Sequence, residues 1–163
     1  EAKAVSQNQD VPEQFRKQLT AFVKSYFTIK NALTASDVAS AQSAVSKSKA
    51  SLTKVEMGLL DEKSHDIWMG LLKPIQGSLD KIQSTKDVEV QRSHFETLSD
   101  NLISAVAYFG VEENTVYKQY CPMAFKDKGA FWLSGEKEIK NPYFGEAMLT
   151  CGEVKETFQP TNP

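Results

Sequence analysis

The sequence predicts a mainly α-helical protein, an up-down-up-down four-helix bundle with a small irregular or β-structured C-terminal segment packed on one end. Apolar residues recur at three- and four-residue spacing through the first 110 residues, which is the period of one helix face. After Gly110 this period gives way to short extended stretches separated by turn-forming residues. Four amphipathic helices with short connections are accommodated most simply by a bundle.

The first two helices have recognisable signals at their ends. The first is expected to begin at Val11–Pro12 with Asp10 as its N-cap, and its apolar stripe runs to Leu33. Ser36 is expected to cap the second helix, whose apolar stripe continues to Leu59. The opposite face of this second helix carries Ser, Lys and Gln, which indicates a solvated surface.

The third and fourth helices follow the same pattern. A turn at residues 58–62 precedes the third helix, and Pro74 is expected to kink or divide it because proline removes a helical hydrogen bond. Asp87 is the expected N-cap of the fourth helix. Gly110 is expected to end it at the position where glycine commonly terminates helices.

The chain is expected to form a single domain, because 163 residues suffice for one hydrophobic core and are few for two. Three short strands are expected in its last third, at Thr115–Tyr120, Gly129–Ser134 and Glu153–Phe158. The expected organisation is a flexible leader over 1–10, a domain over 11–158 made of the bundle (11–110) and the C-terminal segment (111–158), and a frayed tail over 159–163.

Charge and hydropathy exclude two classes of partner. The formal net charge is −2 and the basic residues are scattered, whereas nucleic-acid binding requires a concentrated basic surface. The apolar runs are too short for a transmembrane segment. The small, polar residues that follow Glu1 are typical of a chain whose signal peptide has been removed, so we expect a periplasmic or otherwise exported protein. A protein that carried a lipid anchor before processing would fit the same composition. The composition leaves the oligomeric state open.

Sulfur-containing residues bracket the segment from Tyr120 to Val154. Cys121 and Met123 open it, and Met148 and Cys151 close it. Thiolates and thioethers are soft ligands, and two of each around one point would suit Cu(I) or Ag(I). Cys-x-Met places both side chains on one face of an extended strand. We therefore predict a soft-metal site if the two ends of this segment meet.

A second group lies upstream. His65 and Met69 are four residues apart and share one helix face, and Met57 precedes them. In an up-down bundle, the connection before the third helix lies at the end where the fourth helix ends. The segment with Cys121 leaves the bundle there, so His65 and Met69 are second-rank candidate ligands. The same argument places His94 at the far end and excludes it.

Simpler interpretations remain open for all of these residues. A Cys121–Cys151 disulfide would close a loop of 31 residues and stabilise the fold by roughly 3–4 kcal/mol. Methionines on amphipathic helices usually fill core space, and His65 is as well explained by packing. A Cys121–His65 dyad would lack a third orienting residue, and no phosphate loop or dinucleotide motif occurs, so we expect no enzyme.

Several motifs together resemble a known family. They are VYKQYCPMA (116–124), GAFWLS (129–134), IKNPYFG (139–145) and MLTCG (148–152), with the segments around residues 65–69 and 91–99. They resemble a bacterial family catalogued as a domain of unknown function, number 3347, over roughly Phe15 to Val154. Cys121-Pro122-Met123 is also similar to the core of a heavy-metal-binding motif of copper transporters, which continues into a histidine where this chain has Ala124.

The resemblance implies an envelope location and copper or silver traffic, since such domains occur as exported proteins and fused to adaptor subunits of heavy-metal efflux pumps. The leading hypothesis is an exported protein that binds Cu(I) or Ag(I) and sequesters it or passes it to an efflux system, with an efflux adaptor or a copper chaperone as partner. The alternative is a non-catalytic envelope interaction or structural module stapled by a Cys121–Cys151 disulfide.

Overall fold

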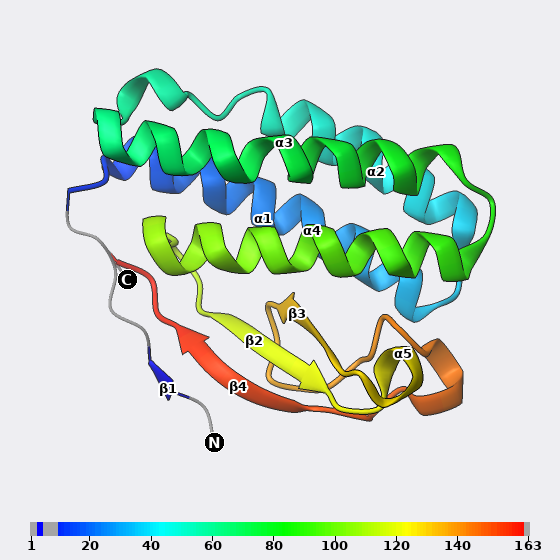
Figure 1. Cartoon of the computed structure of the whole chain (residues 1–163). Coiled ribbons are helices and arrows are strands. Elements are labelled where there is room, and N and C mark those ends of the chain that lie inside the picture. The colour runs from blue at the N-terminus through cyan, green and yellow to red at the C-terminus, as the bar shows by residue number, and fades with distance from the viewer. Residues whose placement is uncertain (1–2, 5–9, 162–163) are drawn as a thin grey trace.

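The computed structural model describes residues 3–4 and 10–161 and contains the predicted four-helix bundle (Figure 1). The long helices are α1 (Glu13–Thr34), α2 (Val38–Leu52), α3 (Glu62–Ser84) and α4 (Val88–Phe109). Each packs against its neighbours in sequence, and α1 also contacts α4, which closes the bundle. The mainly helical class is therefore confirmed.

The apolar stripes predicted from the sequence form the core. On α1 the stripe residues are fully or almost fully buried: Phe15, Leu19, Phe22, Val23, Tyr26, Ile29 and Leu33. Aromatic rings join the helices near one end, where Phe15 meets Trp68 edge-on at 5.4 Å between centroids and Phe109 at 4.9 Å. Large aromatic side chains contribute strongly to core stability because each buries a large apolar area.

Two predicted helix starts are wrong by one or a few residues. Pro12 rather than Asp10 is the N-cap of α1. Asp37 rather than Ser36 caps α2, and its carboxylate accepts a hydrogen bond from the backbone N–H of Ser40 at 3.0 Å. Ser36 instead has a φ of 55°, a left-handed conformation that turns the chain out of α1. The prediction that Asp87 caps α4 and Gly110 ends it is confirmed.

Two other expectations for the helices are corrected. The second helix does not run to Leu59, because α2 ends at Leu52 and a separate 3₁₀ turn, Met57–Leu59, follows. Val55 lies between α2 and this turn, and its side chain is buried. The chain therefore approaches the core at Val55, whereas a longer α2 would have continued along the core surface. Helix α3 continues through Pro74, so the predicted division is wrong, and the other predicted outcome, a kink at Pro74, stays a prediction.

The C-terminal third forms a small sheet. Strands β2 (Val116–Cys121), β3 (Ala130–Ser134) and β4 (Glu153–Phe158) pair antiparallel in the order β4-β2-β3, and β1 (Lys3–Ala4) adds parallel to β4. These three strands lie close to the three predicted ones. Between β2 and β3 is the four-residue turn α5 (Ala124–Asp127), and before β4 is a 3₁₀ turn, Gly145–Met148.

The sheet lies along the bundle beside α1 and α4 and not at one end, which differs from the sequence-based expectation (Figure 1). Near the end of α4, the backbone N–H of Glu112 donates to Thr20 Oγ1 on α1 at 2.8 Å. Near the start of α4, Arg92 Nε donates to the carbonyl of Pro142 at 2.8 Å. Strand β2 therefore carries the chain back along the bundle, by about 20 Å for its six residues.

Parts of the two termini belong to the sheet region. The flexible leader predicted over 1–10 falls mostly on residues 1–2 and 5–9, which lie outside the described residues, whereas Lys3–Ala4 form β1. The predicted frayed tail includes residues 162–163, also outside them. Thr161 is held, because its backbone N–H donates to the carbonyl of Val111 at 2.9 Å.

Helix α3 contains two glycines whose replacement should stabilise the protein. A Cβ built on Gly70 or Gly77 meets nothing within 4 Å. We expect Gly70→Ala and Gly77→Ala each to raise the free energy of unfolding by about 0.5–1 kcal/mol, because alanine loses less backbone entropy in a helix. Urea denaturation measures the change. Gly152→Ala is the control and should destabilise, since its φ is 141° and its Cβ would lie 2.9 Å from the carbonyl oxygen of Tyr120; a gain there would contradict this interpretation.

Candidate functional site

Cys121 is the last residue of β2 and is completely buried. It pairs with Ala130 of β3 across the sheet. On the other side of β2, the chain that enters β4 approaches closely at Gly152, where even a Cβ atom would lie 2.9 Å from the backbone carbonyl oxygen of Tyr120 in β2. The missing side chain at Gly152 thus lets the preceding residue, Cys151, reach the end of β2.

Cys151 is half-buried and is positioned by Asn141, a fully buried residue. The side-chain amide of Asn141 donates to the carbonyl of Cys151 at 2.9 Å, and its backbone N–H donates to the carbonyl of Leu149 at 2.8 Å. Its side-chain oxygen accepts from the backbone N–H of Tyr143 at 2.8 Å. One asparagine therefore fixes both ends of the loop that carries Met148 and Cys151.

The structure brings the two thiols together as free cysteines. Burial raises the pKa of the Cys151 thiol, and the adjacent thiol of Cys121 raises it further, while the backbone N–H of Met123 acts in the opposite direction. Burial disfavours the charged thiolate, and a neighbouring thiol that also ionises opposes a second negative charge. The resting state of Cys151 at neutral pH is a neutral thiol.

Both methionines lie beside this thiol pair. Met123 is two residues after Cys121, its backbone N–H acts on the Cys151 thiol, and its side chain is 45% exposed. Met148 is half-buried, and its carbonyl accepts from the backbone N–H of Cys151 at 3.2 Å. The prediction that Cys121 and Met123 share the face of one strand is wrong, because β2 ends at Cys121 and Met123 already belongs to the turn that follows.

The turn after Met123 has an unusual backbone. Phe125, Lys126 and Asp127 have φ values of 53°, 55° and 67°, which is the left-handed region. L-residues pay roughly 1–2 kcal/mol each in that region, and consecutive ones are rare. Contacts on both sides hold the turn: Phe125 packs against Tyr143 at 5.2 Å between ring centroids, and Lys128 pairs with Glu96 on α4 at 2.8 Å. Strain of this kind is concentrated at functional sites.

His65 and Met69 do not join the thiol pair, which corrects the expectation that they could. Ser64, beside His65, contacts the hydroxyl of Tyr108 at the end of α4 at 3.1 Å, whereas Asn141–Pro142 is tied to Arg92 at its start. About 24 Å of helix separates Arg92 from Tyr108. The sequence argument failed because β2 carries Cys121 away from the end where α4 finishes.

The remaining surroundings of these two residues are ordinary. His65 is 41% exposed at its side chain, with Nδ1 3.9 Å from Asp66, and Met69 is 42% exposed. His94 lies in the first two turns of α4, as expected, but the cysteines lie at this same end, so the expectation that His94 is far from them is wrong. Across residues 3–4 and 10–161, no three His, Cys, Asp or Glu side chains gather in a way that could hold a metal ion.

Sequence reasoning overlooked Asn141 and Arg92, which build the site. Both entered the sequence analysis only within segments that carry the family resemblance, Asn141 in IKNPYFG (139–145) and Arg92 in the segment around residues 91–99. The available signals were an asparagine before proline, which favours turn initiation, and an arginine in the first turns of a helix, where the macrodipole does not favour a positive charge.

Comparison with known proteins gives one match. The model of a family described as "Protein of unknown function (DUF3347)" matches residues 22–114. This range covers most of α1 and all of α2, α3 and α4, and the motifs at 116–152 lie outside it. No curated protein and no solved structure matches the chain. In the part of the chain that the structure describes, none of the helices has the length and apolarity needed to cross a bilayer.

The thiol environment predicts a slow, base-dependent reaction with alkylating agents. We expect the rate of Cys151 modification by iodoacetamide, followed by mass spectrometry, to rise with a midpoint above the ordinary thiol pKa of about 8.5, because only the thiolate reacts. Cys121→Ser should lower this midpoint without abolishing the shift, since burial remains. A midpoint at or below the ordinary value in the wild-type protein would contradict the raised pKa of the Cys151 thiol.

Proposed function

The chain belongs to the DUF3347 family, and we propose that it is an exported, non-catalytic protein that binds Cu(I) or Ag(I) at Cys121 and Cys151, with Met123 and Met148 as flanking ligands. The observation that carries the proposal is the proximity of the two thiols of Cys121 and Cys151, which lie 30 residues apart in the sequence. His65 and Met69 are not part of the proposed ligand set.

The chemistry of the donors favours a soft monovalent ion. Thiolates and thioethers bind Cu(I) and Ag(I) well, whereas zinc sites are built from cysteine, histidine and carboxylates. Two thiols with two thioethers supply four soft donors without a carboxylate. The exposed side chain of Met123 can turn toward an arriving ion, and Met148 is partly open to solvent.

The state of the thiols supports binding over catalysis. A nucleophilic cysteine of an enzyme normally has a lowered pKa, which burial and the second thiol oppose at Cys151. A soft cation reverses this preference, because it stabilises the thiolates and releases their protons. Metal binding should therefore become tighter as the pH rises toward the raised thiol pKa.

The proposed setting is the cell envelope, with delivery of the ion to a heavy-metal efflux adaptor or a copper chaperone. The family resemblance seen in the sequence supports this setting, since it implies exported proteins associated with copper traffic. An ion held by partly exposed donors suits transfer to another protein, because a partner's ligands can approach it.

Competition for Cu(I) tests the proposal. The fully reduced protein, kept anaerobic, should withdraw one equivalent of Cu(I) from bicinchoninate, and Cys121→Ser with Cys151→Ser should abolish this. Met123→Leu and Met148→Leu should each weaken binding by roughly tenfold, as loss of a supporting ligand does. Undiminished affinity in the double-serine variant would refute the assignment.

Two further variants sharpen this experiment. Trp132 lies beside Gly152, next to Cys151, so in a Trp68→Phe background its fluorescence should change as Cu(I) binds. The matched control combines His65→Ala with Met69→Leu. These two residues of α3 lie beside the C-terminal end of α4, away from the cysteines, so the control should leave both the Cu(I) affinity and the Trp132 fluorescence unchanged. A loss of affinity in this control would return these two residues to the ligand set.

A structural disulfide is the second candidate function of the same pair. The specific observation in its favour is the direct proximity of the two thiols, which a disulfide requires. Its formation would join the two sulfur atoms and release two protons and two electrons to an oxidant such as oxidised glutathione. The protein would then be a non-catalytic interaction or structural module of the envelope.

The two functions differ in what oxidation does. If the disulfide-bonded protein is the resting form, oxidised glutathione should remove both free thiols and raise Tm by roughly 10 °C, because the disulfide reduces the number of conformations open to the unfolded chain. Cu(I) would then add no stability. Thiol counting and thermal melts measure this, with Cys121→Ser as the control that cannot form the bridge. Full thiol content after oxidation would exclude the disulfide.

A further inference from the structure

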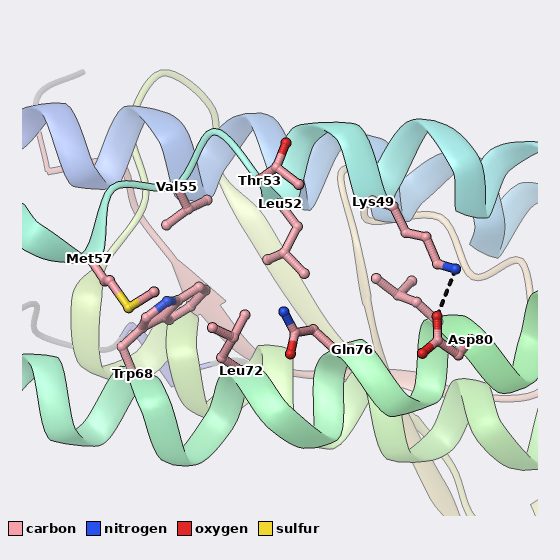
Figure 2. Close-up of a pocket in the computed structure, with 10 residues that line it drawn as sticks. Lys49, Leu52, Thr53, Val55, Met57, Trp68, Leu72, Gln76 and Asp80 are labelled. Atoms are coloured by element: carbon pink, nitrogen blue, oxygen red, sulfur yellow. Dashed lines mark ion pairs between the residues drawn. The ribbon is translucent and has the colours of Figure 1, made fainter.

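A cavity of about 410 Å³ lies between α2 and α3, away from the cysteines (Figure 2). Six apolar side chains form most of its wall: Leu52, Val55, Met57, Trp68, Leu72 and Leu79. Its size is within the range of small-molecule sites, which are mostly apolar clefts with a few placed polar groups.

The cavity exists because α2 is short. Helix α2 has 15 residues and α3 has 23. The difference of eight residues corresponds to about 12 Å, or two turns. Beyond Leu52 the chain crosses this space as an irregular segment, so α2 does not pack on the part of α3 around Trp68 and Leu72 (Figure 2).

The other end of the cavity is polar and has no net charge. Lys49 and Asp80 form an ion pair of 2.7 Å across it, and Lys49 also donates to Gln83 at 2.8 Å. Gln76 lies between Leu52 and Asp80 and directs its amide toward α2 (Figure 2). Gln76 is exposed, and its amide makes no hydrogen bond to another described residue, so it offers both a donor and an acceptor to a ligand.

The dimensions favour a small molecule over a partner helix. The wall on α3 runs from Trp68 to Asp80, about 18 Å along the axis. A helix about 10 Å across would require roughly 1,400 Å³ over that length. The empty space here is about 880 Å³ even when the part open to solvent is included, so a helix would not fit within it. A narrow apolar chain or a small aromatic body fits the available space.

We propose that this cavity binds a small amphipathic molecule that places a linear apolar body over Trp68 and Leu72 and a neutral, hydrogen-bonding head group at Gln76. A neutral head leaves the Lys49–Asp80 pair intact. A carboxylate would face Asp80 and an ammonium group would face Lys49, so either charge meets repulsion as well as attraction. Long-chain alcohols and amides belong to the expected class.

A fluorescent probe tests the site without knowledge of the natural ligand. N-phenyl-1-naphthylamine, a neutral aromatic amine, should bind the reduced protein with enhanced emission, and 1-decanol should displace it. Decanoate and decylamine, which have the same chain length, should displace it at least tenfold less effectively. Displacement by either charged compound at the concentration required for 1-decanol would overturn the neutral head group.

Variants locate the site. Gln76→Leu should weaken 1-decanol about tenfold and leave probe binding unchanged, whereas Lys73→Leu, an exposed α3 residue outside the cavity wall, should change neither. Thr53→Trp fills the cavity from its exposed rim and should remove probe binding, with a far-UV circular dichroism spectrum and a cooperative thermal melt like those of the wild-type protein as proof of folding. Absence of probe binding to the wild-type protein, or its persistence in Thr53→Trp, would overturn the proposal.

Discussion

The guanidinium group of Arg92 joins the helical bundle to the C-terminal third. It is 4% exposed, and it donates to the carbonyls of Pro142 at 2.8 Å and Leu33 at 2.9 Å and to the hydroxyl of Ser36 at 3.0 Å. Its remaining nitrogen pairs with Glu89 at 2.8 Å. A buried guanidinium persists only when its donors are satisfied, and removing one side of such an arrangement typically costs 3–5 kcal/mol. The position also suits a cation, because Leu33 belongs to the last turn of α1, where the macrodipole is negative.

The position of Cys151 follows from this anchor. Arg92 fixes Pro142, the neighbouring Asn141 fixes the carbonyl of Cys151, and the loop between them therefore has little conformational freedom.

The position of Cys121 follows from a separate contact between the bundle and the sheet. The hydroxyl of Tyr26 on α1 accepts from the backbone N–H of Leu133 in β3 at 3.1 Å, and β3 is paired with the strand that ends at Cys121.

The thiols therefore meet because the bundle holds both segments, and not because either segment is stable alone. The contact between Tyr26 and Leu133 is held in place by further interactions of Tyr26. Its hydroxyl also contacts Ser99 on α4 at 2.6 Å, and burial raises the pKa of this hydroxyl well above the ordinary value. Phe95 stacks on the same ring at 4.9 Å. Leu133 is only about 10 Å along β3 from Ala130, the residue paired with Cys121, so a change at Tyr26 should affect the position of that cysteine.

The sequence was sufficient for the features that depend on local periodicity. The four helices, the caps at Asp87 and Gly110 and the positions of three strands were predicted, because each is specified by residues within a few positions of one another. The choice between Ser36 and Asp37 as a cap was not predictable in the same way. Both are good capping residues, and the difference depends on how α1 ends.

The site was only partly predictable for a related reason. The pairing of Cys121 with Cys151 followed from their shared chemistry, but their place beside the start of α4 depends on the course of β2. Strand pairing is long-range, and neither hydropathy nor spacing determines whether a strand continues away from the bundle or returns along it. The inclusion of His65 rested on that choice, and so did the exclusion of His94.

Under the proposed function, the burial of the four sulfur-bearing residues forms a gradient. Met123 is largely exposed, Cys151 and Met148 are partly buried, and Cys121 has no exposed surface. An ion arriving from solvent would meet a neutral thioether first, which binds without losing a proton, and would reach the thiols as their protons leave. Cys121 would be the innermost donor, because it has no exposed surface, and the ion would be reached from the side of Met123. A partner that removes the ion must then approach over Met123 and the left-handed turn at residues 125–127, where the backbone is already strained.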